Sequence, residues 1–296
     1  MGSIWSQTCS IGRRPPLRGH LKTQAAVVGA GMAGVLTAYA LQQAGLSVVV
    51  LEAGRIAGGQ TQNTTAKITS QHGLIYSRLI QSFGEETARR YAKANQDAVR
   101  AYQDLIDVQG ISCDWEERCA YLYGPDVTVL QEEAEAARRL GLPASFTREV
   151  SIPIPHDGAV RFEGQAQFHP LKFLKVLADQ LTIYEQSRVL TAEGDLLTTE
   201  LGSVQAEHIV FACHFPFVNF PGMYFARMHQ ERSYVLALQG APPVDGMFLG
   251  VGRDTFSLRT YGELLLLGGG GHRTGENTEG GQYDLLRRKA LSLIHI

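Results

Sequence analysis

A glycine-rich turn between two apolar runs constrains this chain more than any other feature. The turn Gly29-Ala30-Gly31-Met32-Ala33-Gly34 follows apolar residues and precedes a predicted helix. A second apolar run ends in Glu52-Ala53-Gly54, about 20 residues beyond the glycines. In a strand–turn–helix–strand unit of this kind the first glycine permits the turn, the second lets a pyrophosphate approach, and the third lets the helix pack on the strand. The pattern predicts a dinucleotide site with phosphates at the helix N-terminus and Glu52 on the adenosine ribose.

Length and composition fit a globular protein of two domains. The chain has 296 residues, 44% hydrophobic and 19% charged, with a formal net charge of -2. A charge this close to neutral favours neither nucleic acid nor an anionic membrane as a partner, and no apolar run is long enough to cross a bilayer. The N-terminus has no hydrophobic signal core, so we expect a cytoplasmic protein. The oligomeric state stays open.

The four cysteines give no sign of a metal site. Cys9, Cys113, Cys119 and Cys213 form no C-x-x-C pair and have no ligand-like spacing. We expect thiols without a disulfide framework.

Helical and strand patterns alternate along the rest of the chain. Helices are predicted over 85–108, 126–140 and 170–181, and strands at 119–123, around Val189, at 196–199, at 207–212 and in short pieces from 224 to 271. His169 precedes a proline at a predicted helix start, where we expect it to cap the helix. A Pro-rich passage at 152–155 suggests a domain boundary. We predict an arm at 1–23, a Rossmann-like α/β domain from 24–84 and 152–215, and an interleaved α+β substrate domain on an antiparallel sheet from 85–151 and 216–275.

Several further segments resemble a known family. They are Gly58-Gly59-Gln60-Thr61, Asn63 to Lys67, Gly164 to Pro170, Val189, Phe211-Ala212-Cys213 and Gly268 to Gly275. With the glycine turn, they make residues 25–290 resemble FAD-dependent oxidoreductases of the D-amino-acid oxidase, glycine oxidase and sarcosine oxidase group. The resemblance implies a GR2-type fold, FAD as cofactor, and oxidation of the C–N bond of a small-molecule amine or amino acid by hydride transfer to flavin N5. Residues 64–73 resemble a bacterial subgroup in which a Rieske iron–sulfur domain often follows.

The resemblance also implies roles for individual cofactor residues. It places the backbone and hydroxyls of Gly59, Thr61, Thr65 and Ala66 beneath the pyrophosphate, Val189 at the adenine, and Ala212 near the cofactor. Cys213 and His214 depart from the family's small Ala-x-Gly turn.

Four residues are candidates for the substrate side of the flavin: Lys67, Tyr234, Arg259 and His272. A cation at Lys67 favours the anionic reduced flavin, and Arg259 could hold a substrate carboxylate bidentately. Tyr234 could line the open face of the flavin and His272 could face the substrate. A surface lysine, a structural salt bridge, a core tyrosine and a structural histidine are the respective alternatives.

The last six residues of the chain, 291–296, are unusual for a natural protein sequence. Residues 291–296 read as the translation of a transposon-end adapter from sequencing libraries, and 276–290 as the start of a helix. We therefore expect an N-terminal fragment whose flavin site and turnover are incomplete. Other functions stay open: a flavin dehydrogenase that passes electrons to a Rieske domain, a non-catalytic dinucleotide-binding or RNA-modification module, and a nicotinamide-dependent dehydrogenase. The polar passage directly after Glu52 argues against the last of these.

Overall fold

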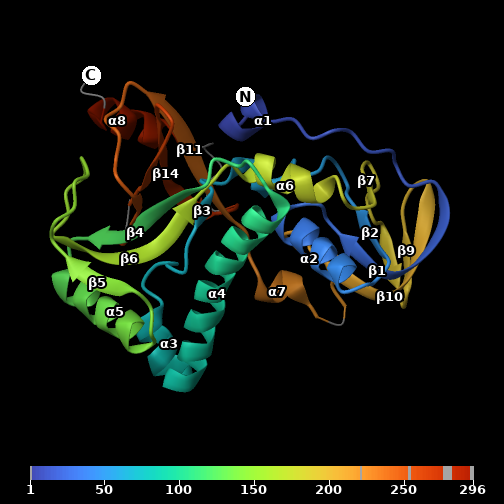
Figure 1. Ribbon diagram of the computed structural model, residues 1–296, viewed down its shortest axis with the longest axis horizontal. Coiled ribbons are helices and arrows are strands. Elements are labelled where there is room, and N and C mark those ends of the chain that lie inside the picture. The colour runs from blue at the N-terminus through green and yellow to red at the C-terminus, as the bar shows by residue number, and fades with distance from the viewer. Residues whose placement is uncertain (1, 221, 253–254, 276–281, 294–296) are drawn as a thin grey trace. The chain divides into compact units, whose positions relative to one another are not determined.

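The chain forms two compact units, each with its own sheet (Figure 1). This computed structural model describes residues 2–220, 222–252, 255–275 and 282–293. The first unit comprises Met1–Thr64, Ile111–Cys113 and His169–Gln230, and the second comprises Thr65–Gly110, Asp114–Phe168 and Glu231–Ile296. A mixed α/β architecture with interleaved segments was predicted, and this fold class is confirmed.

The first unit is built on a six-stranded sheet of order β7-β2-β1-β10-β9-β8. Its strands are β1 (Gly19–Val28), β2 (Val48–Leu51), β7 (Ile183–Tyr184), β8 (Thr191–Glu193), β9 (Leu196–Thr198) and β10 (Gly202–Phe211). The first four in that order run parallel, and β9 and β8 are antiparallel to their neighbours. Every residue of β2 is apolar and buried, as is typical of a parallel strand covered on both faces.

The described part of this unit also contains helices. They are α1 (Ile4–Thr8), α2 (Met32–Gln43), the 3-10 helix η1 (Gln60–Asn63), α6 (Pro170–Ala178) and α7 (Tyr224–Arg227). The helix α2 packs on β1, β2 and α6. The predicted capping by His169 is confirmed, because its Nδ1 accepts a hydrogen bond from the Lys172 N–H at 3.2 Å.

Two expectations for the first unit differ from the structure. The N-terminal segment is not only an arm, because α1 lies within it and β1 already begins at Gly19. No strand forms around Val189, which lies between β7 and β8. The apolar character of Val189 instead places its side chain in the core cluster with Val28 and Leu51.

The second unit is built on an eight-stranded sheet of order β11-β14-β13-β12-β4-β6-β3, with β5 also paired to β6. Its strands are β3 (Lys67–Ile68), β4 (Glu116–Gly124), β5 (Ala144–Thr147), β6 (Gly158–Gln167), β11 (Glu231–Gln239), β12 (Met247–Gly250), β13 (Ser257–Tyr261) and β14 (Leu264–Arg273). Only the pair β12 and β4 is parallel among these described strands. The predicted antiparallel character is therefore present.

The helices in the described part of the second unit are α3 (Tyr76–Phe83), α4 (Glu85–Gln109), α5 (Val127–Arg139) and α8 (Tyr283–Leu293). The long helix predicted from residue 85 ends at Gly110 in the left-handed conformation, φ 58°. The helix α8 packs on β11 and β14 through Leu286, Ala290 and Leu293. The rest of the expected terminal segments, 276–281 and 294–296, lies outside the described residues.

The division into units does not follow the predicted domain segments. Residues 65–84 and 152–168 belong to the second unit, because β3 and β6 hydrogen-bond into its sheet. The Pro-rich passage at 152–155 is thus a loop before β6 and does not separate the units.

The sheet of the second unit is strongly curled. Four strand spacings separate β3 from β13, about 19 Å in a flat sheet. The Lys67 Nζ nevertheless donates to the Ser257 Oγ on β13 at 2.6 Å. The sheet therefore folds over, and its concave face can enclose polar side chains from distant strands.

A buried carboxylate holds the start of α3. Glu133 on α5 is 0% exposed and accepts hydrogen bonds from the N–H groups of Ile75, Tyr76 and Ser77. Its Oε2 also accepts from the Ser77 hydroxyl at 2.9 Å. Free N–H groups at a helix start require such an acceptor, and Ile75 at the N-cap position provides none.

We expect Glu133→Ala to lower the free energy of unfolding by about 3 kcal/mol, because several buried donors lose an anionic acceptor together. Urea denaturation followed by circular dichroism measures this. The matched control is Glu132→Ala, the exposed neighbour on the same helix. Equal stabilities of the two variants would contradict the assigned role of Glu133.

Candidate functional site

The predicted glycine turn joins β1 to α2 and is tightly packed. Gly29 has φ 106°, and a Cβ there would lie 2.7 Å from the Ala212 carbonyl oxygen. A Cβ on Gly34 would lie 1.9 Å from the Gly29 carbonyl oxygen. Ala212 follows β10, and its N–H donates to the Val28 carbonyl at 2.8 Å. Only glycine fits at residues 29 and 34, and Ala212 closes the turn from the neighbouring strand.

Space remains at the turn where a phosphate would lie. A Cβ on Gly31 would meet only the Thr61 Oγ1, at 3.4 Å, and nothing lies within 4 Å of a Cβ on Gly59. The Met32 N–H donates to the Thr61 Oγ1 at 2.9 Å, which fixes η1 over the helix start. Ala33 is exposed beside it. The open surface at Gly31, with the N-terminal N–H groups of α2 behind it, fits a pyrophosphate.

Glu52 lies at the end of β2 and faces the turn. Its Oε2 accepts from the Ala30 N–H at 2.7 Å and its Oε1 from the Gly54 N–H at 2.7 Å. Each carboxylate oxygen retains a lone pair for a ribose hydroxyl. Ala53 between these residues is exposed. The acid is thus oriented by the backbone of the turn that it was predicted to serve.

Residues 184–189 run beside Glu52. The Glu52 N–H donates to the Tyr184 carbonyl and the Ser187 N–H donates to the Glu52 carbonyl, both at 2.8 Å. Val189 continues this segment with a buried side chain. Val189, which was predicted to lie at the adenine, is therefore close in sequence to a segment that is hydrogen-bonded to Glu52.

The expected residues Thr65, Ala66 and Lys67 belong to the second unit. Ala66 has φ 54°, and its carbonyl accepts from the Phe168 N–H at 3.4 Å. The Thr65 Cγ2 would lie 3.8 Å from a Cβ on Gly268, in the glycine-rich part of β14.

Lys67 crosses the concave face of the curled sheet. Its Nζ donates to the Phe248 carbonyl at 2.7 Å and to the Ser257 Oγ at 2.6 Å. Burial, and secondarily the nearby Arg259 cation, lowers the pKa of Lys67 from 10.5 to about 7. A lysine with this pKa changes its charge near neutral pH.

Arg259 on β13 is fully buried. Its exposed fraction is 0%, its Nη2 lies 3.5 Å from the Phe168 carbonyl, and its guanidinium carbon lies 5.7 Å from the centre of the Tyr261 ring. Burial lowers the pKa of Arg259 to about 10, while the charge of Glu116 acts in the opposite direction. The group remains a cation at neutral pH.

The polar residues around Arg259, Glu116 and Tyr261 among them, were not predicted as site residues. Gln167 Nε2 donates to the Glu116 Oε2 and to the Thr260 carbonyl, both at 2.9 Å. The Tyr261 hydroxyl donates to the Asp114 Oδ2 at 2.7 Å, and burial raises the pKa of Tyr261. No local pattern marks Glu116 or Gln167, because β4 and β6 each carry several other polar and charged residues.

Tyr234 and His272 pack against each other in another part of the same unit. The centres of their rings are 5.8 Å apart, with an angle of 20° between the ring planes. The Tyr283 ring packs edge-on against Tyr234, with ring centres 4.8 Å apart. The His272 Nδ1 lies 3.1 Å from the Gly270 carbonyl and donates to it. Tyr234 is buried in the apolar cluster with Leu286. Packing contacts therefore account for both rings.

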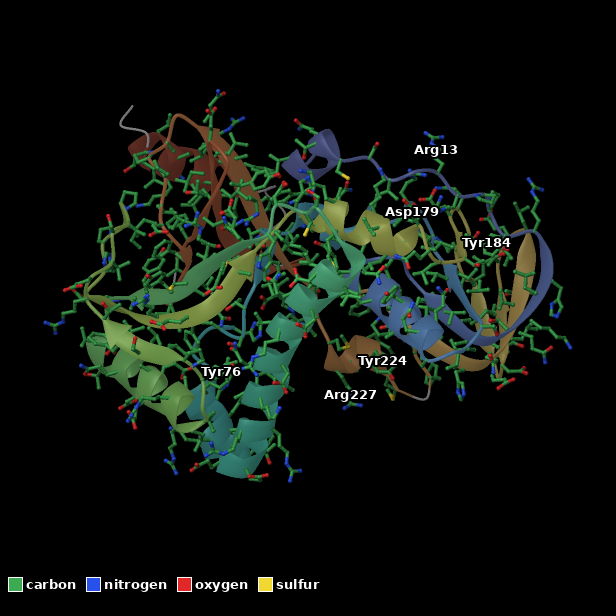
Figure 2. All side chains as sticks on the ribbon, viewed as in Figure 1. Arg13, Tyr76, Asp179, Tyr184, Tyr224 and Arg227 are labelled. Atoms are coloured by element: carbon green, nitrogen blue, oxygen red, sulfur yellow. The ribbon has the colours of Figure 1, made fainter. Side chains whose placement is uncertain are left out.

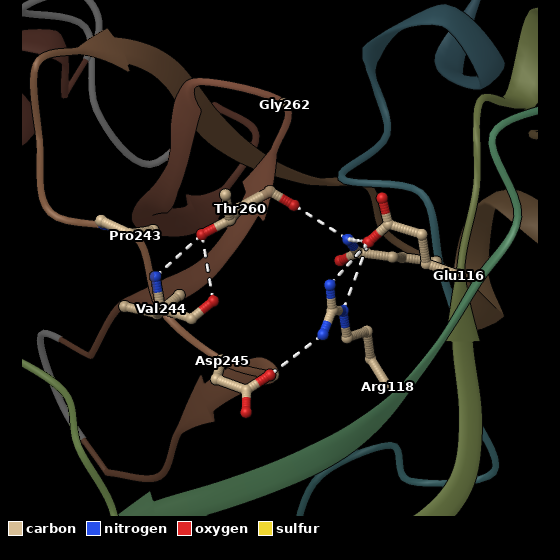
Figure 3. Close-up of a pocket in the computed structure, with 9 residues that line it drawn as sticks. Glu116, Arg118, Pro243, Val244, Asp245, Thr260 and Gly262 are labelled. Carbon is tan, nitrogen blue, oxygen red and sulfur yellow. Dashed lines mark hydrogen bonds and ion pairs between the residues drawn. The ribbon is translucent and has the colours of Figure 1, made fainter.

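A pocket of about 330 Å³ with both polar and apolar lining residues opens beside β13 (Figure 3). Arg118 lies 3.2 Å from Glu116 and 3.1 Å from Asp245 within it. The Thr260 Oγ1 is hydrogen-bonded to the N–H and carbonyl of Val244. None of the predicted site residues lines this pocket.

The described part of the chain shows neither a candidate membrane-spanning helix nor a candidate metal-binding cluster. There, no helix has the length and apolar character needed to cross a membrane. Within the same residues, no group of three His, Cys, Asp or Glu side chains is arranged to hold a metal ion.

Comparison with known proteins places these features in a family. The profile of the family described as "FAD dependent oxidoreductase" (DAO) matches residues 24–295. The Bacillus subtilis (strain 168) protein "Putative Rieske 2Fe-2S iron-sulfur protein YhfW" is 34% identical over 314 residues, which cover 99% of this chain and 61% of that protein. Gamma-glutamylputrescine oxidoreductase of Escherichia coli (strain K12) is 26% identical over 202 residues, 63% of this chain and 47% of that protein.

A solved structure shows the same fold. The L-proline dehydrogenase of P. horikoshii has a TM-score of 0.71 at 17% identity and covers 95% of this chain and 78% of its own. The chain spans 61% and 47% of the lengths of the two curated relatives above. Since the family profile extends over both units, from the glycine turn into α8, the chain belongs to the DAO family of FAD-dependent oxidoreductases, and the predicted cofactor, FAD, is confirmed.

Proposed function

We propose that this chain is the flavin- and substrate-binding part of an enzyme that oxidises the C–N bond of an amine or amino acid. The observation that carries the proposal is the pair of basic side chains on the concave face of the second unit, the half-buried Lys67 and the fully buried Arg259. Bound FAD supplies the acceptor, at N5, for a hydride from the carbon next to nitrogen. The names of two similar proteins, an oxidoreductase of gamma-glutamylputrescine and a dehydrogenase of L-proline, support this substrate class.

Residues of the first unit would bind the dinucleotide half of FAD. The turn at Gly29, Gly31 and Gly34 admits the pyrophosphate, with Met32, Ala33, Gly59 and Thr61 around it. Glu52 is held with free lone pairs for the ribose. These roles need no movement of the turn, because its backbone conformation is already that of a dinucleotide site.

Lys67 would provide positive charge to the reduced cofactor. Its bonds to Phe248 and Ser257 leave one of the three ammonium protons for an anionic partner. Such a partner would raise the pKa of Lys67 from about 7 and keep it charged. A fixed cation of this kind stabilises negative charge without solvent reorganisation.

Arg259 would act on Lys67 through its charge. Its guanidinium is fully buried, so a substrate carboxylate cannot reach it without displacing Phe168 or Tyr261. Its positive charge lowers the pKa of Lys67, which therefore responds strongly to any anion that binds beside it. Tyr234 and His272 would support the sheet by packing.

A second candidate differs in the electron acceptor. The Bacillus relative, of which this chain covers 61%, carries a Rieske 2Fe-2S iron–sulfur name. In this alternative the enzyme is a dehydrogenase that passes electrons from the flavin to an iron–sulfur domain. The two candidates share the C–N oxidation and differ in whether oxygen reoxidises the flavin.

The visible spectrum of the purified protein tests the proposal. We expect paired flavin absorption bands that bleach anaerobically when an amine or amino acid is added. Rapid return of the bands with oxygen supports an oxidase, and slow return supports the dehydrogenase. Flavin that bleaches with reduced nicotinamide nucleotides, and with no amine in a panel of primary and secondary amines and amino acids, would contradict the proposal.

A further inference from the structure

We propose that the N-terminal arm, defined as residues 2–18, is a strap that holds the FAD-binding loops of the first unit in their binding conformation. The arm contacts the phosphate side of the site near its start and the adenosine side near its end. It thereby supports the loop around η1, which ends at Thr64, and the segment after β7 at residues 185–189. The proposal rests on the family's cofactor, FAD, and does not depend on the substrate.

At the phosphate side, Trp5 anchors the loop after η1. Its side chain is 1% exposed, and its Nε1 donates to the Thr64 carbonyl at 2.8 Å. Thr64 follows η1 directly, and Thr61 within η1 accepts the Met32 N–H at the start of α2. A displaced Thr64 would move the segment that lies over the expected pyrophosphate position.

The helix α1 is itself fixed to α6 through His169. The Trp5 and His169 rings meet edge-on with centres 4.9 Å apart. Since the His169 Nδ1 accepts from the Lys172 N–H, the neutral tautomer with the proton on Nε2 fits this site, and in it Nε2 donates to the Thr8 Oγ1 at 2.9 Å. The Thr8 hydroxyl in turn donates a hydrogen bond to the Ile4 carbonyl at 2.7 Å. The tryptophan is therefore held on a rigid element.

At the adenosine side, the arm bonds the segment after β7. The Arg14 N–H donates to the Glu185 Oε2 and the Leu17 N–H donates to the Ser187 Oγ, both at 2.9 Å. Figure 2 shows Arg13 on the arm in the same region of the first unit as Asp179 and Tyr184. The side chain of Leu17 is 1% exposed and packs in the same cluster as Val189.

Glu185 links this contact to the loop after the ribose acid. Its Oε1 accepts from the Ile56 N–H at 2.8 Å, and its Oε2 pairs with Arg55. Arg55 also donates from Nη2 to the Ile11 carbonyl on the arm at 2.9 Å. The carboxylate is buried, and a buried charge must be paired or hydrogen-bonded. The arm and the loop that begins after Glu52 both supply such contacts to Glu185.

The arm and FAD should therefore stabilise each other. If the arm raises the affinity for FAD by some factor, then FAD stabilises the docked arm by the same factor, because binding free energies are reciprocal. Loops outside regular structure gain most from such contacts, since no continuous ladder of backbone hydrogen bonds holds them.

Two substitutions test the strap while preserving apolar packing. Trp5→Phe removes the donor to Thr64 and keeps an aromatic ring, and Ser187→Ala removes the acceptor for Leu17. We expect each to weaken FAD binding by roughly 5- to 150-fold, the usual range of coupling between sites. Quenching of flavin fluorescence measures the dissociation constant, and circular dichroism of the flavin-free variants checks that they fold. Trp115→Phe, the other tryptophan of the chain, is the matched control.

Limited proteolysis gives an independent readout. Arg13 and Arg18 are exposed trypsin sites on the arm, whereas Arg14 precedes a proline. We expect FAD to slow cleavage after Arg13 in the wild-type protein, and to slow it less in Trp5→Phe. Dissociation constants within about twofold of wild type in both folded variants, or a cleavage rate that FAD does not change, would overturn the proposal.

Discussion

Gly34→Ala should lower the free energy of unfolding by about 3 kcal/mol or more, the largest effect expected of a single methyl group in this chain. The new Cβ would lie 1.9 Å from the Gly29 carbonyl oxygen, and that atom is backbone in a turn already closed by Ala212. Neither β1 nor α2 can withdraw without breaking the parallel sheet or the helix start. Urea denaturation of the flavin-free protein measures the loss.

Gly31→Ala separates stability from cofactor binding and is the control. Gly31 has φ −80°, which any residue adopts, and a Cβ there meets only the Thr61 Oγ1 at 3.4 Å. We expect a change in unfolding free energy within about 1 kcal/mol, with FAD affinity lowered at least about tenfold because the methyl group occupies the phosphate surface. Equal stability of Gly34→Ala and Gly31→Ala would contradict the packing argument.

Lys67→Met should remove a pH dependence of stability between about pH 7 and pH 10.5. The pKa of Lys67 is about 7 in the folded protein and 10.5 without the fold, so in that window the unfolded chain binds the extra proton. The wild-type free energy of unfolding therefore gains, relative to the variant, up to about 1.4 kcal/mol per pH unit as the pH rises. Below pH 7 both states hold the proton and the difference is constant. Urea denaturation of flavin-free protein from pH 6 to 9.5 measures it.

Two further variants sharpen this prediction. Lys67→Arg keeps a cation that does not titrate, so its difference from Lys67→Met should stay flat with pH. Arg259→Met removes the second cause of the lowered pKa and should move the onset of the wild-type slope to higher pH. If plots of unfolding free energy against pH ran parallel for wild type and Lys67→Met over the whole range, the lowered pKa of Lys67 would be disproved. With FAD bound, we expect Lys67→Met to slow reduction by an amine about 100-fold.

Local chemistry made the dinucleotide turn predictable. A strand, a turn and a helix start are set by residues within a few positions of one another. Gly29 and Gly34, whose backbones are in close contact, are only five positions apart in the sequence. The helix from residue 85 was predictable for the same reason, because its apolar spacing and its terminal Gly110 act locally. His169 as a cap also follows from its neighbours.

The errors have a common physical origin. Val189 has the apolar character of a strand residue, but a strand exists only where a partner supplies a ladder, and residues 187–190 make scattered bonds instead. The prolines at 152–155 do interrupt structure locally, yet β6 then pairs with β4 and β5 and stays in the second unit. Glu116 and Gln167 gave no local signal because only the register of β4 with β6 makes them partners.

The sequence by itself determined that this chain builds a βαβ dinucleotide unit, because glycines at fixed spacing and two apolar runs act over short distances. Only the tertiary structure decided which distant side chains meet. Lys67 reaches Phe248 and Ser257 because an eight-stranded sheet curls, and Trp5 reaches Thr64 because α1 docks on α6. Contacts across such separations depend on strand order and register, which are set by the packing of the whole unit. The local sequence around either residue therefore does not predict them.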